Sequence, residues 1–131
     1  MPLLDDIETL LSSGTTSTSI SKDYMPATPD TCLAVYGYGG LAPTHTMVNG
    51  PGLSILEEPR VQIVARSMSL QSAHKDARSV YKVINGLRKR TINGMTYHWA
   101  SAIQEPFLLE RDANARFSVA CNYELKKDRS T

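Results

Sequence analysis

The stretch Arg116-Phe-Ser-Val-Ala-Cys-Asn-Tyr-Glu-Leu125 decides the fold of this chain. Apolar or aromatic side chains stand at every second position from Phe117 to Leu125, and polar or small ones fall between them. Successive side chains of a strand point to opposite faces of the sheet, so the alternation predicts a strand with one buried face. Residues 112–115 before it predict a turn. The polar residues 126–131 after it predict a frayed tail.

Further strands are predicted upstream of this one. The segments 32–38 and 60–66 are rich in β-branched, aromatic and other apolar residues, and each is bounded by turn-forming residues. Asn93-Gly94 separates the short segment 91–92 from 95–104, and an Asn-Gly pair between two apolar runs is a strong signal for a two-residue hairpin. We therefore expect strands 95–104 and 116–125 to be joined to their neighbours by short antiparallel connections.

Two helices are predicted from apolar residues spaced three and four apart. The first begins near Pro2, carries acidic residues in its first turns and ends near Gly14. The second follows the serine-rich segment 67–72 and ends at Asn85-Gly86, where glycine provides a left-handed stop. The expected fold is α+β, with a mostly antiparallel sheet and both helices packed on one face. The side chains expected in the core are Val80, Ile84, Phe117, Val119 and Cys121.

A long loop is predicted from about residue 39 to 59, between two of the strands. It holds four glycines and three prolines, and a loop of this length is uncommon in a compact domain unless it has a use. It also carries apolar residues that a free surface loop does not need, which predicts contact with a partner. These candidate contact residues are Leu41, Met47, Val48, Leu53 and Ile55.

Composition limits the range of functions. The chain has 131 residues, enough for one domain, 1–131, and its formal net charge of +1 gives no electrostatic case for binding nucleic acid or a membrane. It lacks an apolar run long enough to span a bilayer, and its acidic start lacks the basic region of a signal peptide. Its two cysteines lie in apolar, strand-like segments and are expected to be buried free thiols.

Enzymatic and metal-binding patterns are weak in this sequence. His45, His74 and His98 are not spaced as metal ligands, so we expect neither a metal nor a cofactor. The sharpest enzymatic alternative is a Mg²⁺-dependent nuclease, in which the carboxylates of Asp112 and Glu124 hold the ion and Lys126 assists the attacking water. Turn chemistry at 112 and an exposed strand end explain the same residues, and we favour a protein without catalytic residues.

Three consecutive cations, Arg88, Lys89 and Arg90, follow the second helix. Cations are favourable beside a helix C-terminus, so a solvated helix end explains them. Contact with phosphate or with an acidic partner surface is the alternative, and these three residues join the candidate contact set. No aromatic residues alternate with them, as they do in many sites for single-stranded nucleic acid.

The ordered series from Glu57 to Leu125 resembles the minor capsid and tail terminator family of siphophages. The resemblance rests on Glu57-Glu-Pro-Arg-Val-Gln-Ile-Val-Ala-Arg66, the helix ending in Val80-Tyr-Lys-Val-Ile-Asn-Gly-Leu87, Thr91-Ile-Asn-Gly-Met-Thr-Tyr97, and the final strand. Ala102-Ile-Gln-Glu-Pro106 and Arg111-Asp112 fit the same series. Ala115 departs from it, because the family often has glycine before the arginine that opens the last strand.

This resemblance implies structural work in a virion. Family members form α/β subunits that close into a ring, usually of six, on the head-proximal end of the tail tube, where they stop tube polymerisation. The implied partners are further copies of the chain, the major tail tube protein and the head-completion or connector protein, and DNA in the lumen is open to passive contact. Assembly in the host cytoplasm and a place in the virion tail follow. The alternative in the same class is a head-completion or connector ring protein.

Overall fold

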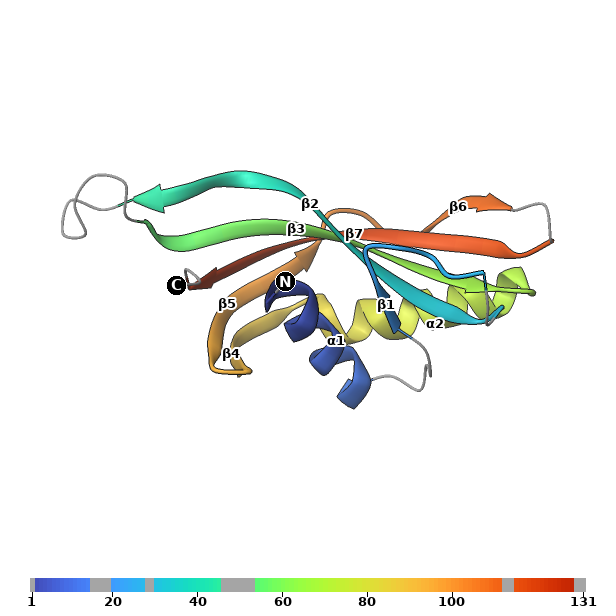
Figure 1. The fold of residues 1–131 in the computed structure, drawn as a ribbon, viewed down its shortest axis with the longest axis horizontal. Coiled ribbons are helices and arrows are strands. Elements are labelled where there is room, and N and C mark those ends of the chain that lie inside the picture. The colour runs from blue at the N-terminus through green and yellow to red at the C-terminus, as the bar shows by residue number, and fades with distance from the viewer. Residues whose placement is uncertain (1, 15–19, 28–29, 46–53, 112–114, 129–131) are drawn as a thin grey trace.

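The computed structural model describes residues 2–14, 20–27, 30–45, 54–111 and 115–128. These form two helices and seven strands in an α+β arrangement (Figure 1). The elements are α1 (Pro2–Gly14), β1 (Ile20–Lys22), β2 (Cys32–His45), β3 (Ser54–Ser67), α2 (Leu70–Ile84), β4 (Leu87–Ile92), β5 (Met95–Ala102), β6 (Phe107–Arg111) and β7 (Phe117–Asp128).

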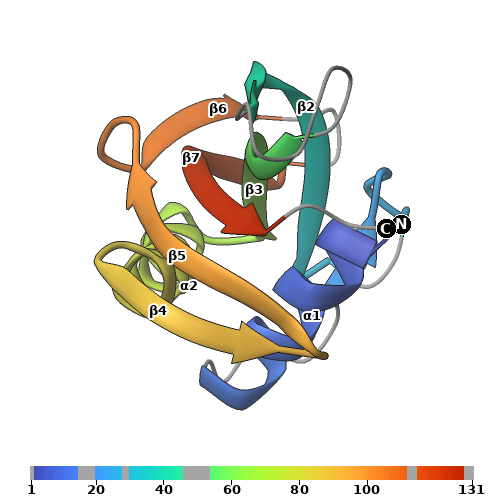
Figure 2. The same ribbon diagram turned by 90° about the vertical axis from the view of Figure 1, so that its left-hand side faces the viewer.

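The strands form one curled sheet in the order β1-β2-β3-β7-β5-β4, and β6 pairs with β7 beside this path (Figure 2). Strand β7 is central, because β3 pairs along one edge of it while β6 and then β5 pair along the other. Only β1 and β2 run parallel among the described strands, and the other five pairings are antiparallel. The sheet is therefore mixed, and the expectation of a mostly antiparallel sheet is confirmed.

The core lies between the two helices and one face of the sheet. Inward residues at alternating positions of β2, β3 and β7 join the apolar stripes of α1 and α2 in a single buried cluster. Val80, Ile84, Val119 and Cys121 are buried as predicted, whereas Phe117 is only partly buried at the edge of the cluster. Burial of large apolar side chains, each contributing about 1.5–3 kcal/mol, holds the helices on this face.

Local signals set the ends of α2 and of the β4–β5 hairpin. The Ser69 side chain accepts a hydrogen bond from the backbone N–H of Ser72 at the start of the helix. Asn85 caps the end of the helix, and Gly86, with φ of 87°, turns the chain into β4. Asn93 and Gly94 have φ of 51° and 80°. A two-residue hairpin turn of type I′ requires positive φ at both of its central residues.

Several predicted boundaries were wrong. The loop expected at 39–59 is mostly strand, because β2 continues to His45 and β3 starts at Ser54. The tail expected at 126–131 is strand as far as Asp128, and Lys127 there is buried. The predicted strand 95–104 ends at Ala102, and β6 was missed. The glycines and proline between Tyr38 and His45 led to the prediction of a loop. In the structure the β2–β3 pairing continues through them with several register shifts.

Candidate interaction surface

Arg88, Lys89 and Arg90 lie on strand β4, so their prediction as the solvated end of a helix was wrong. All three are exposed. Strand β4 is the last of the sheet on its side, and β5 is its only strand partner among the described residues. None of the three forms an ion pair with a described acidic residue. The outer edge of β4 therefore carries three cations and is paired with no described strand, although the Arg88 guanidinium donates a hydrogen bond of 3.0 Å to the carbonyl oxygen of Leu87. We call Arg88, Lys89 and Arg90 the basic edge.

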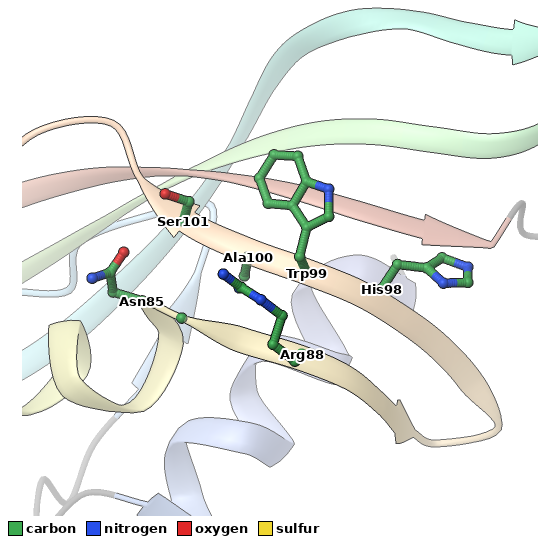
Figure 3. A pocket seen from close by; sticks show the side chains of 7 residues that line it. Asn85, Arg88, His98, Trp99, Ala100 and Ser101 are labelled. Carbon is green, nitrogen blue, oxygen red and sulfur yellow. The ribbon is translucent and has the colours of Figure 1, made fainter.

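A groove of about 460 Å³ lies beside this edge. Arg88 and Trp99 stand directly opposite each other on β4 and β5, and Figure 3 shows both side chains projecting from the two ribbons. The Asn85 side chain accepts a hydrogen bond of 2.9 Å from the backbone N–H of Ala102, which fixes the junction of α2 and β4 at one end. The groove is lined by Asn85, Gly86, Arg88, His98, Trp99, Ala100 and Ser101.

The chemistry of the groove suits anionic and flat apolar groups. A guanidinium such as that of Arg88 donates paired hydrogen bonds to a carboxylate or a phosphate. The half-buried indole of Trp99 offers a flat apolar surface beside it. The sequence indicated the cations, but the pairing of Arg88 with Trp99 depends on the register of the hairpin, which the sequence alone did not link to a site.

The other end of the sheet, at strand β1, carries acidic side chains where the β4 end carries basic ones. Lys22 of β1 binds Asp5 of α1 through an Nζ–Oδ1 distance of 2.6 Å and Glu8 through an Nζ–Oε1 distance of 3.5 Å. The ammonium group lowers the pKa of Asp5, and the hydrogen bond to Asp5 raises the pKa of Lys22. Asp23, also exposed, follows β1 directly. The Asp23 carboxylate accepts a hydrogen bond of 3.4 Å from the backbone N–H of Gly37. This α1–β1 edge thus holds one cation paired with two carboxylates and a third carboxylate beside them, whereas the sequence explained the acidic residues of α1 only as helix-dipole chemistry.

The predicted loop residues lie elsewhere. Leu41 and Ile55 are on β2 and β3, in the ribbon that extends beyond the helices in Figure 1, while Met47, Val48 and Leu53 lie outside the described residues. Strands β7 and β5 separate this ribbon from β4 in the sheet. The structure therefore does not bring the two halves of the predicted contact set together.

A third surface was missed by sequence reasoning. Strand β6 is an edge strand, and its neighbouring residues Leu108 and Leu109 are 48% and 44% exposed. Leu109 also lines a smaller hollow of about 150 Å³ on the face of the sheet away from the helices, together with Tyr36 and Val64. Two adjacent leucines break the alternation that predicts a strand, which is why the pattern did not reveal β6.

The alternative catalytic residues are not assembled by the described part of the chain. Glu124 and Lys126 share a face of β7 as predicted, but Glu124 contacts Arg60 at 3.9 Å and Lys126 contacts Glu58 at 3.4 Å. Asp112 lies outside the described residues. Within the described ranges, no three acidic, histidine or cysteine side chains gather in a way that could hold a metal ion. No described helix is both long and apolar enough to cross a membrane.

Comparison with known proteins provides independent information. The family model described as "Bacteriophage tail terminator protein" matches residues 9–129, which is most of the chain. No curated protein sequence matches. A solved structure that bears no functional name aligns with 99% of this chain and 93% of its own chain, at 13% identity and a TM-score of 0.59. Similarity at that level of identity concerns the fold alone.

Proposed function

Since this chain belongs to the bacteriophage tail terminator family, a family of structural tail proteins, we propose that it closes the head-proximal end of the tail tube as a ring of identical subunits. The match over residues 9–129 is the observation that carries this proposal. More specifically, we propose that six copies form the ring. One face of the ring stops polymerisation of the tube protein, and the other face binds the head-completion complex.

The exposed edges of the sheet support such a role. Strands β1, β4 and β6 each have one edge that no described strand pairs with, and an unpaired edge is a site at which another chain can bind. Contacts that repeat head to tail with a fixed rotation generate a closed ring. A subunit with several separate exposed edges can contact its ring neighbours and also proteins above and below the ring.

The β2–β3 ribbon supplies a further contact in this proposal. It extends past both helices (Figure 1), and Leu41 and Ile55 lie on it. We place the ribbon against a neighbouring subunit or the tube protein, with the helices on the outside of the ring. The candidate contact residues are Leu41 and Ile55 of this ribbon, together with Met47, Val48 and Leu53 of the segment between β2 and β3, which lies outside the described residues.

Tube assembly in the presence of the purified protein tests the proposal. Tube protein that polymerises alone should give tubes of uncontrolled length, and addition of this chain should shorten them and leave a ring at one end in electron micrographs. Size measurement of the chain with and without tube protein reports the ring itself. Tubes of unchanged length, together with binding to the portal or connector instead, would favour the connector alternative.

A further inference from the structure

The two ends of the sheet carry opposite charges. The basic edge, Arg88, Lys89 and Arg90, is at the β4 end. At the β1 end, the described charged residues are three carboxylates, those of Asp5, Glu8 and Asp23, and one ammonium, that of Lys22. Because the whole chain has a formal net charge of only +1, this separation reflects how the charges are placed and not an excess of either sign.

The two edges also face different directions. Strands β1 and β4 terminate the sheet order β1-β2-β3-β7-β5-β4. The sheet is curled, and in Figure 1 the labelled strands β4 and β1 lie on opposite sides of α1. A contact between the β4 edge of one molecule and the β1 edge of another therefore leaves the second edge of each molecule free. Such a contact can repeat from copy to copy.

We infer that the basic β4 edge of one subunit docks against the acidic α1–β1 edge of the next, so that opposite charges join successive copies of the ring. This inference rests on the proposed ring, and its partner is a second copy of this chain. Arg88 and Arg90 face Asp5, Glu8 and Asp23 of the neighbour across the contact. The groove beside Arg88 and Trp99 lies at the same seam and receives side chains of the adjoining α1.

A second copy fits these observations better than nucleic acid does. The chain itself provides an acidic edge to match the basic one, and complementary charge across an interface fixes its register and speeds correct encounter. Exposed charges are screened beyond about 8 Å at physiological ionic strength, so the contact should weaken as salt is added. The charges then determine which edges meet, while apolar contacts at the seam contribute to its strength.

Two charge-reversed proteins test the contact. Arg88→Glu/Arg90→Glu makes both edges acidic. Asp5→Lys/Glu8→Lys/Lys22→Glu/Asp23→Asn leaves two cations against one carboxylate, so the β1 edge becomes basic, and the internal pairs keep their contacts with their signs exchanged. Each protein alone should need at least about a tenfold higher concentration for half-maximal assembly than the parent, since like charges then meet at every seam. The matched control is Lys75→Glu/Lys82→Glu, which reverses two exposed cations of α2, away from both edges, and should assemble as the parent does.

Mixing the two reversed proteins distinguishes the interface from a loss of folding. In an equimolar mixture every seam again joins an acidic edge to a basic one, so alternating rings should form at the concentration that suffices for the parent. Combining all six substitutions in one chain should also restore assembly. Circular dichroism and thermal melting of each protein show whether it is folded before mixing.

The outcomes separate this inference from the proposed function. Rings that form normally from Arg88→Glu/Arg90→Glu overturn the inference and leave the terminator proposal intact, and so does a mixture that fails to assemble from two folded proteins. Loss of DNA binding with unchanged assembly would assign the basic edge to nucleic acid and overturn the inference. A parent protein that remains monomeric with and without tube protein overturns both.

Discussion

The Tyr97 phenol donates a hydrogen bond of 2.5 Å to Oδ2 of Asp6, joining α1 to β5 across 91 positions of the chain. The same carboxyl group accepts a second bond, from Nδ2 of Asn93 to Oδ1, at 2.9 Å. Asp6 is only 3% exposed, and the Tyr97 side chain is fully buried. One acidic side chain of the first helix therefore holds the β4–β5 hairpin against it. This places the acidic edge and the basic edge in one rigid unit.

Removing that carboxyl group should destabilise the fold. Asp6→Ala leaves the buried Tyr97 hydroxyl without this acceptor, and we expect the free energy of unfolding to fall by about 2–3 kcal/mol. Urea denaturation followed by circular dichroism measures it. The control is Asp5→Ala, one position away on the same helix, which removes an exposed, solvent-screened ion pair and should cost much less stability than Asp6→Ala. Equal losses in the two variants would contradict the anchoring role of Asp6.

A charge introduced into the core should unfold the protein. Ile84 of α2 is fully buried, and Ile84→Asp places an unpaired carboxylate among apolar side chains at a cost of several kcal/mol. We expect insoluble or unfolded protein on expression. Lys75→Asp changes an exposed position of the same helix and should remain folded. A soluble Ile84→Asp protein with a normal melting temperature would show that this face of α2 is not in the core.

The fold should lose stability in alkaline solution. Burial raises the pKa of the Tyr123 phenol and of the Cys32 and Cys121 thiols. In the unfolded chain such groups ionise between about 8.5 and 10, so above that range the unfolded state has released protons that the native state retains. Stability must then fall as pH rises. Denaturation midpoints measured between neutral pH and pH 10.5 should show this decline.

Tyr123→Phe should reduce the alkaline decline. The Tyr123 hydroxyl has no hydrogen-bond partner among the described residues, so its removal should leave stability at neutral pH unchanged or raise it by up to about 1 kcal/mol. Tyr24→Phe is the control, because Tyr24 is 60% exposed. This change should alter neither the stability at neutral pH nor its decline in alkaline solution. An unaltered pH profile for Tyr123→Phe would assign the decline to other groups.

Glycine at position 115 should stabilise the turn before β7. Ala115 has φ of 62°, a conformation that costs a residue with a Cβ atom about 1–2 kcal/mol. Ala115→Gly removes this strain but adds freedom to the unfolded chain, so the expected gain is about 0.5–1 kcal/mol. The reciprocal change, Gly94→Ala at φ of 80°, should be destabilising. Thermal melting compares the two, and a loss of stability in Ala115→Gly would contradict the strain argument.

Replacing the segment 46–53 between β2 and β3 tests the contact proposed for this part of the chain. A Gly/Ser linker in place of residues 46–53 keeps β2 and β3 and removes Met47, Val48 and Leu53. We expect an unchanged melting temperature and weaker ring formation or tube attachment, measured by sedimentation with tube protein. A linker that keeps those three apolar residues in place is the control. Equal assembly by both variants would mean that Met47, Val48 and Leu53 make no contact that assembly needs.

Elements with an uninterrupted pattern were predictable from the sequence. The alternation of β7, the apolar stripes of both helices and the Asn93-Gly94 turn each contain their own structural signal. Strand β4 could not be recognised in the same way, because its four middle residues, Arg88 to Thr91, are all polar and exposed and show no alternation. Edge strands of this kind depend on pairing with a neighbour, here β5, and that pairing is not visible in the local sequence.

The candidate surface was predictable only in part, for a related reason. The cations of the basic edge stand out in the sequence, but whether they end a helix or border a sheet depends on where α2 stops and β4 begins. The acidic edge joins Asp5 and Glu8 to Lys22 across a segment whose path the sequence does not specify. Tertiary register, and not residue type, determines which charges become neighbours.

The central position of β7 has a consequence for how the protein is made. Translation delivers each residue of β3 well before its partner on β7, and Val64 precedes its partner Ala120 by 56 positions. Strands β3, β5 and β6 all pair with β7. Until β7 leaves the ribosome, these three strands lack their common partner, and their unpaired backbone edges and apolar side chains can bind other nascent chains. A message truncated before Arg116 yields a product that cannot close its sheet. Infected cells should therefore clear such fragments by proteolysis or accumulate them as aggregates, and terminators become available only when whole chains are released.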